Sequence, residues 1–241
     1  MFSKNRKVRT IILIILLLIC LCYEHKDDIK SFFTRDKKEN AEVVNLPNIP
    51  PYSGEDIIIL NNNEPEFDDL ANTTDSFEVY SNLDELGRCG VAYANIGKDL
   101  MPTSKRESIG SIKPSGWHIA KYDIITDGLY LYNRCHLIAY QLTAENANPK
   151  NLITCTRHTN ADVMQEYEIK VGNYIRKTSN HVLYRATPIF EGSNLVATGI
   201  QLEARSVEDN GKGIKFNIFI YNVQPGIEID YRTGESKLIS E

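Results

Sequence analysis

One amphipathic helix, set among short strands, most constrains how this chain can fold. Between about Asn160 and Lys177, apolar side chains recur at helical spacing, at positions Val163, Tyr167, Val171, Tyr174 and Ile175. Thr159 or Asn160 can cap the start of this helix, and Arg176 and Lys177 suit its C-terminal end. The spacing predicts a single helix with one apolar face.

Apolar and β-branched runs on both sides of that helix predict strands. Two runs precede it, Cys89–Ile96 and Leu129–Tyr132. Three follow it, separated by turns that contain Gly and Asn: His181–Phe190, Leu195–Ser206 and Ile214–Val223. Strands, one helix and then more strands imply an α+β domain built around an antiparallel sheet.

The N-terminus has the pattern of a secretory signal. Four basic residues precede the unbroken apolar run Ile11–Cys22, and charged residues follow it. The run is shorter than the ~20 residues of a relaxed transmembrane helix. No small-x-small cleavage site follows it, so we expect an uncleaved signal anchor over residues 1–23, with a cleaved signal as the alternative. The excess of basic residues before the run then leaves the rest of the chain outside the cytoplasm, either membrane-anchored or secreted.

Residues 24–75 are rich in Asn, Asp, Glu, Lys and Pro, which predicts a polar stalk. A short apolar segment within it, Ile57–Leu60, could pair as an edge strand with the main domain, which we expect over residues 76–241. Nine of the 27 basic and thirteen of the 32 acidic residues precede Ser76, which leaves 18 and 19 after it. That part is nearly neutral and lacks the strongly basic signature of many nucleic-acid binders. Residues 98–177 do hold a small basic surplus, eleven against eight.

Five cysteines are too few and too scattered for a disulfide scaffold. Two of them lie in the apolar run, and Cys89, Cys135 and Cys155 remain, with no C-x-x-C pair that would indicate zinc. One bridge, such as Cys135–Cys155, is allowed outside the cell, and buried thiols are the default. A hydrolase with Cys135 or Cys155 as nucleophile is an alternative that no local signature supports.

The candidate chemistry lies around the helix. Arg134 and His136, at the end of an apolar strand, place a phosphate-binding cation beside a candidate base. Asn151 and Asn160 offer neutral oxygen ligands of the kind that Mg²⁺ accepts, and Glu168 lies eight residues beyond Asn160. On an ideal helix Asn160 and Glu168 are about 80° apart, so both can face one site. Each residue alone would be an ordinary packing, capping or solvated residue, but together they indicate a one-metal phosphodiesterase.

Asn133-Arg-Cys-His-Leu137 resembles the Asp-Arg-Gly-His element of the DNA/RNA non-specific endonucleases, a branch of the ββα-metal (His-Me finger) superfamily. Further similar stretches follow in order: Asn148–Leu152, Thr159-Asn160, Glu168, Leu202–Ser206, Asn222–Gly226 and Asp230–Gly234. They are most similar to the bacterial DNA-entry nucleases and streptococcal DNases, and they cover about residues 76–237. The resemblance implies a ββα-metal finger on an antiparallel sheet, and a sequence-nonspecific endonuclease that uses Mg²⁺, with Mn²⁺ as a substitute, to cut DNA or RNA.

The resemblance also implies roles for individual residues. His136 corresponds to the general base that deprotonates the attacking water, and Asn160 to the one direct protein ligand of the magnesium ion. Glu168 corresponds to an acidic residue that holds a metal-bound water. Asn151 corresponds to an asparagine that supports the site, and Arg134 to the arginine that flanks the phosphate.

Some positions are less well defined. Arg157 and Lys150 are candidate substrate contacts, although such charges are more often only solvated. His118, His158 and His181 are interpreted as structural or surface residues. The chain departs from the family pattern with Asn133 for Asp and Cys135 for Gly, in the turn that aims His136. These departures leave open a catalytically degenerate member that binds nucleic acid or a partner at the cell surface.

Overall fold

The structure, a computed structural model, describes residues 49–67, 73–126 and 128–239. The signal anchor expected over residues 1–23, and much of the expected stalk, lie outside these ranges. Among the helices that are described, none is long and apolar enough to cross a membrane.

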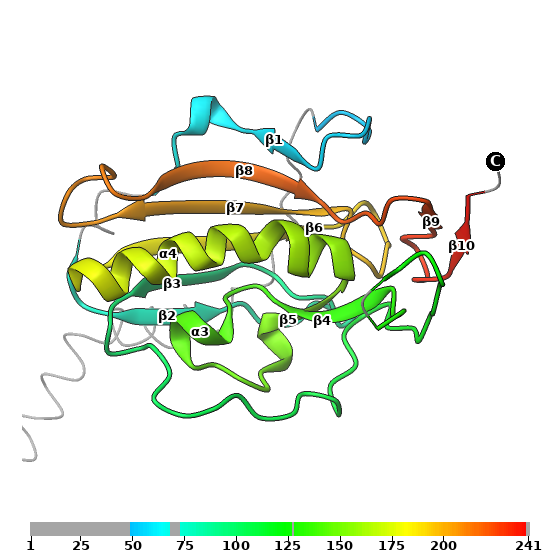
Figure 1. The fold of residues 1–241 in the computed structure, drawn as a ribbon, viewed down its shortest axis with the longest axis horizontal. Coiled ribbons are helices and arrows are strands. Elements are labelled where there is room, and N and C mark those ends of the chain that lie inside the picture. The colour runs from blue at the N-terminus through cyan, green and yellow to red at the C-terminus, as the bar shows by residue number, and fades with distance from the viewer. Residues whose placement is uncertain (1–48, 68–72, 127, 240–241) are drawn as a thin grey trace, which may run out of the picture. The chain divides into compact units, whose positions relative to one another are not determined.

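A six-stranded antiparallel sheet forms the framework, with strand order β1-β8-β7-β6-β3-β2 (Figure 1). Its strands are β1 (Ile57–Ile59), β2 (Phe77–Tyr80), β3 (Ala92–Ile96), β6 (Val182–Ile189), β7 (Gly199–Ser206) and β8 (Lys215–Tyr221). Four of them, β3, β6, β7 and β8, lie within runs that the sequence predicts as strands, whereas β2 was not expected. The predicted α+β class with an antiparallel sheet is confirmed.

The edge strand expected from the apolar segment of the stalk is also confirmed. Ile57 lies opposite Ile220 and Ile59 opposite Ile218, so β1 extends the sheet beyond β8. The Leu60 amide donates to the Asn217 carbonyl (2.9 Å) and continues the pairing. The sheet therefore includes residues earlier in the chain than Ser76.

A two-stranded ribbon and the helix that follows it form a strand–strand–helix unit. The ribbon pairs β4 (Tyr132–His136) with β5 (Leu152–Thr156), and a short helix α3 (Tyr140–Thr143) and a 3₁₀ turn (Pro149–Asn151) connect the two strands. The chain then enters a π-helix (His158–Met164) that continues as α4 (Gln165–Thr178). A second small ribbon pairs β9 (Ile227–Ile229) with β10 (Ser236–Leu238). A strand was predicted over Leu129–Tyr132, but β4 begins at Tyr132 and extends to His136. The strand therefore contains Arg134 and His136 and does not end before them.

The start of the helix differs from the prediction. Arg157 occupies the N-cap position, and its side chain forms no cap hydrogen bond. Other side chains meet the first amides: the His158 amide donates to Gln224 Oε1 (3.2 Å) and the Thr159 amide donates to Thr156 Oγ1 (3.0 Å). Thr159 is buried, and its hydroxyl donates to the Tyr221 carbonyl of β8 (2.9 Å), so it anchors the helix to the sheet instead of capping it. The first turns are π-helical, a geometry that is frequent at functional sites.

The core holds the ribbon and the helix in fixed positions. Figure 1 shows α4 lying along one face of the sheet. Val171 and Ile175 of α4 are fully buried in the same cluster as Cys135, Ile153 and sheet residues from β3 to β8. One continuous core thus positions the two elements that carry the candidate site.

Candidate active site

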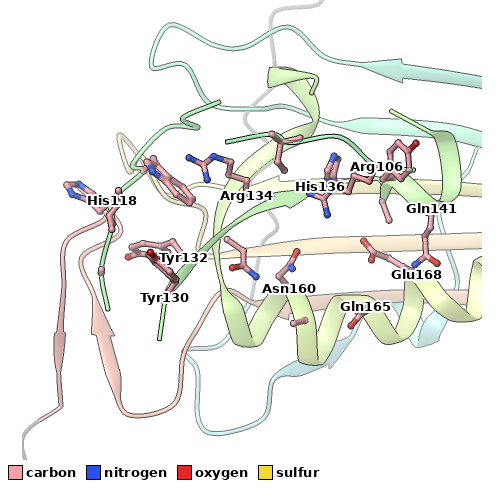
Figure 2. Close-up of a pocket in the computed structure, with 18 of the residues that line it drawn as sticks. Arg106, His118, Tyr130, Tyr132, Arg134, His136, Gln141, Asn160, Gln165 and Glu168 are labelled. Atoms are coloured by element: carbon pink, nitrogen blue, oxygen red, sulfur yellow. The ribbon is translucent and has the colours of Figure 1, made fainter. Parts of the chain in front are cut away.

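Four of the site residues predicted from the sequence line one cleft of about 830 Å³: Arg134, His136, Asn160 and Glu168. Strand β4, helix α3, the start of the long helix and the connection before β4 form its walls. Figure 2 shows His136, Arg106 and Glu168 at one end of the cleft and Tyr130 and His118 at the other. The labelled lining residues are Arg106, His118, Tyr130, Tyr132, Arg134, His136, Gln141, Asn160, Gln165 and Glu168.

His136, the last residue of β4, is held as a neutral imidazole. Its side chain is 6% exposed, and Nε2 lies 2.7 Å from the Asn146 carbonyl oxygen. Because a carbonyl only accepts hydrogen bonds, Nε2 carries the proton and Nδ1 is the basic nitrogen. Burial lowers the pKa of His136 to about 4; the backbone carbonyls oppose this shift and the Arg106 charge adds to it. The ring is therefore unprotonated at neutral pH and able to accept a proton.

Glu168 enters the cleft from α4. It is buried, and burial raises the pKa of its carboxyl to about 8, while the Arg106 charge opposes the shift. The buried hydroxyl of Tyr184 has no hydrogen-bond partner among the described residues. Burial raises its pKa, and the charge of Glu168 adds to this shift. A cation bound beside this buried carboxyl would lower its pKa and stabilise its charged form.

Asn160 lies in the π-helix with its side chain at the cleft, between the His136 end and the Tyr130 end (Figure 2). Within the described chain its amide forms no side-chain hydrogen bond, so its oxygen is available as a ligand. No group of three or more His, Cys, Asp or Glu side chains in the described ranges could hold a metal ion. The amide of Asn160 and the carboxylate of Glu168 instead fit a hard cation that keeps most of its waters.

Arg134 lines the cleft, but its guanidinium is largely committed to the protein. Nε donates to the Ile112 carbonyl, Nη2 donates to the Gly110 carbonyl (2.9 Å), and the group lies 4.0 Å from the centre of the Trp117 ring. The main effect of Arg134 in this structure is thus to hold the loop that forms one wall of the cleft.

Arg106 is the cleft residue that the sequence analysis missed. It is exposed, and its charge lowers the pKa values of both His136 and Glu168. No spacing or motif connects Arg106 with those residues, and the only sequence signal was the small basic surplus of residues 98–177. Arg106 is therefore an exposed cation of the cleft whose charge acts on both His136 and Glu168.

The other predicted site residues lie outside the cleft. Asn151 is fully buried; its Oδ1 accepts from the Ile138 amide (2.9 Å) and its Nδ2 donates to the Ile138 carbonyl (3.0 Å). It therefore holds the main chain just after His136 and does not line the cleft. Neither Lys150 nor Arg157 lines the cleft, and Lys150 Nζ donates to Asn82 Oδ1 (2.8 Å).

A disulfide joins the two strands of the ribbon. Cys135 and Cys155 are both fully buried, their Cα atoms are 5.8 Å apart, and their sulfur atoms are bonded. The alternative with either residue as a thiol nucleophile is therefore wrong. Cys89 is the free cysteine in the described chain, and burial raises the pKa of its thiol to about 12. Cys135, which stands where the family pattern has Gly, is thus bonded to Cys155 and directly precedes His136 in the chain.

Comparisons with known proteins agree with this arrangement. The model of the DNA/RNA non-specific endonuclease family matches residues 69–208, more than half of the chain. NucA from Streptococcus agalactiae, solved with a magnesium ion bound, is 28% identical with a TM-score of 0.66, over 76% of this chain and 87% of NucA. The Sda1 nuclease, solved with a bound zinc ion, is 29% identical with a TM-score of 0.56, over 68% and 81%. An extracellular endonuclease shares the fold at 19% identity and a TM-score of 0.54, over 68% of this chain and 87% of its own. The chain belongs to the DNA/RNA non-specific endonuclease family.

Proposed function

We propose that the chain is a metal-dependent endonuclease that hydrolyses phosphodiester bonds of DNA, and also of RNA, with little sequence preference. One observation carries this proposal: His136, a neutral base with a fixed tautomer, shares a cleft with the oxygen ligands Asn160 and Glu168. Membership of the family supports the same reaction.

In the proposed reaction His136 Nδ1 accepts the proton of the water that attacks phosphorus. The Asn146 carbonyl keeps the ring in the required tautomer and orientation (2.7 Å to Nε2). Arg106 binds the scissile phosphate and offsets its negative charge, and Arg134 contributes by holding the wall of the cleft in place. Asn151 holds the main chain that follows the base.

Asn160 would bind the metal ion directly through its amide oxygen, and Glu168 would hold one of the waters of that ion. We propose Mg²⁺, with Mn²⁺ as a substitute, because the donor set is made of oxygens. The magnesium in NucA and the zinc in Sda1 support a divalent cation. The chemistry that such an ion supplies is stabilisation of the charge on the phosphate and a source of the proton for the leaving oxygen.

We also propose that the enzyme acts outside the cytoplasm, either anchored by its N-terminal segment or secreted. The disulfide Cys135–Cys155 suits an oxidising compartment. The basic and then apolar N-terminal sequence is that of an export signal.

The proposal is tested by incubating the full chain with plasmid DNA and with RNA, in Mg²⁺ and in EDTA. We expect cleavage in Mg²⁺, none in EDTA, and a loss of at least about 100-fold in rate for His136→Ala. His181→Ala is the matched control, because His181 lies away from the cleft and pairs with Glu208 (2.7 Å). A folded wild-type chain that cuts nothing with several divalent metals would contradict the proposal and favour the degenerate binding protein.

A further inference from the structure

The end of the cleft opposite His136 is built from aromatic and apolar side chains that hydrolysis does not need. Figure 2 shows Tyr130, Tyr132 and His118 there, with Asn160 between them and the His136 end. Tyr130 is 46% exposed, and Ile119, which follows His118 in the chain, is 77% exposed. Both line the same cleft as the candidate base, so this apolar surface is continuous with the reaction site.

Main-chain hydrogen bonds of its two neighbours hold Tyr130 at that surface. The Tyr122 amide donates to the Leu129 carbonyl (3.0 Å), and the Leu131 amide donates to the Ala120 carbonyl (2.9 Å), on either side of Tyr130. Leu129 adopts φ 65°, a left-handed conformation that is rare and costly for a leucine. The residue just before Tyr130 thus has a strained backbone conformation.

The Lys121 ammonium lies close to the Tyr130 ring. Lys121 is exposed, forms an isolated bridge with Tyr130, and places Nζ 4.4 Å from the centre of the tyrosine ring. Lys121 does not itself line the cleft, but it lies beside Tyr130, which does. An exposed aromatic side chain in a cleft that continues to the candidate reaction site, with a lysine beside it, matches the elements that bind unpaired nucleotides. The ring stacks on a base, and the cation lies near the phosphate attached to it.

We propose that Tyr130 stacks on one nucleobase of the substrate strand, away from the scissile phosphate, while Lys121 neutralises the phosphate next to that base. This inference rests on the proposed function and specifies its substrate class. A base can reach Tyr130 only when it leaves its own stack, so the cleft favours single strands and unpaired ends of DNA or RNA over an intact duplex. Every base has a flat π-face, so the contact adds no sequence preference.

The test is binding of the full chain, in EDTA, to a single-stranded oligonucleotide that contains 2-aminopurine, whose fluorescence reports stacking. We expect Tyr130→Ala to weaken this binding about tenfold, since stacking on one base is worth ~1–3 kcal/mol. Tyr130→Phe keeps the ring and should keep the affinity. Tyr52→Ala, which removes a tyrosine of similar exposure (39%) that does not line the cleft, is the control.

Lys121→Gln gives an independent measurement that leaves Tyr130 in place. It should lower the salt dependence of single-strand binding by about 0.7 in the slope of log affinity against log salt, which corresponds to one phosphate contact. Equal weakening of single-strand and duplex binding by Tyr130→Ala, or no change in either, would overturn the inference. Because the assay needs no cleavage, a chain that binds through Tyr130 but never cuts contradicts only the proposed function. A chain that cuts while Tyr130→Ala binds normally contradicts only the stacking site.

Discussion

The opposite pKa shifts of Glu168 and His136 predict how the stability of the protein depends on pH. Burial raises the pKa of Glu168 from 4.5 to about 8, so the folded chain keeps a proton that the unfolded chain has lost above pH 4.5. The stability that this group contributes is therefore complete below pH 4.5 and is lost as the pH rises to about 8. The free energy of unfolding falls by ~1.4 kcal/mol per pH unit over that window.

His136 has the reverse sign. Burial lowers its pKa from 6.5 to about 4, so the unfolded chain binds the proton more readily, and stability is lost as the pH falls from 6.5 towards 4. Between pH 4.5 and 6.5 the two slopes cancel. Between pH 6.5 and 8 only the Glu168 slope remains, and over about 1.5 pH units it removes about 2 kcal/mol from the free energy of unfolding.

The assay is urea unfolding of the full chain at pH 6.5 and pH 8, in EDTA and without reductant. Glu168→Gln removes the titrating group, so this variant should lose about 2 kcal/mol less than the wild type over the interval. Glu166→Gln is the matched control, because Glu166 lies on the same helix, is 64% exposed and pairs with Lys170. If the wild type and Glu168→Gln lose stability in parallel, Glu168 is not a neutral buried carboxyl and the reasoning is refuted.

Three further predictions concern the support of the site. Replacing both Cys135 and Cys155 by Ala should lower the free energy of unfolding by about 3 kcal/mol, as the chain-entropy estimate gives for a separation of 20 residues. Urea unfolding measures it, and an unchanged midpoint would contradict the structural role of the bridge. Asn151→Ala should lower the cleavage rate with little change in the Michaelis constant, because it leaves the main chain after His136 unpaired while the cleft lining stays intact. A loss confined to the Michaelis constant would argue against that role. Arg106→Ala should lower kcat/KM and move the acid limb of its pH profile upward, since the arginine charge depresses the pKa of His136; an unmoved limb would place Arg106 away from the base.

Local sequence patterns were sufficient for much of the fold. Strands β6, β7 and β8 follow apolar runs bounded by Gly- and Asn-containing turns, signals that act over a few residues. The edge strand β1 was visible as an apolar segment in a polar stretch. His136, Asn160 and Glu168 were found through motif and spacing, and the fold brings them into one cleft because a ribbon and the helix after it are adjacent in the chain.

The remaining features depend on contacts between distant segments. Arg106 lies in a loop and meets His136 and Glu168 only in the folded chain, so no periodicity identifies it. The carbonyls that hold Arg134 belong to the same connection between β3 and β4, 22 and 24 residues before it in the chain. The first helix amides are met by the side chains of Thr156 and of Gln224, which comes 66 residues after His158. The Thr159 hydroxyl instead binds the Tyr221 carbonyl of a strand that comes 62 residues later. Such tertiary contacts override local preferences for caps and strand ends.

The most direct test of the account is chemical rescue of the proposed base. His136→Gly should lose Mg²⁺-dependent plasmid cleavage and regain part of it when imidazole is added, in proportion to the unprotonated fraction of the imidazole. The His181→Gly variant should cut like the wild type, with or without imidazole, because its histidine lies away from the cleft. A folded His136→Gly protein that cuts as fast as the wild type, or whose lost activity imidazole does not restore, would contradict the assignment of His136 as the general base.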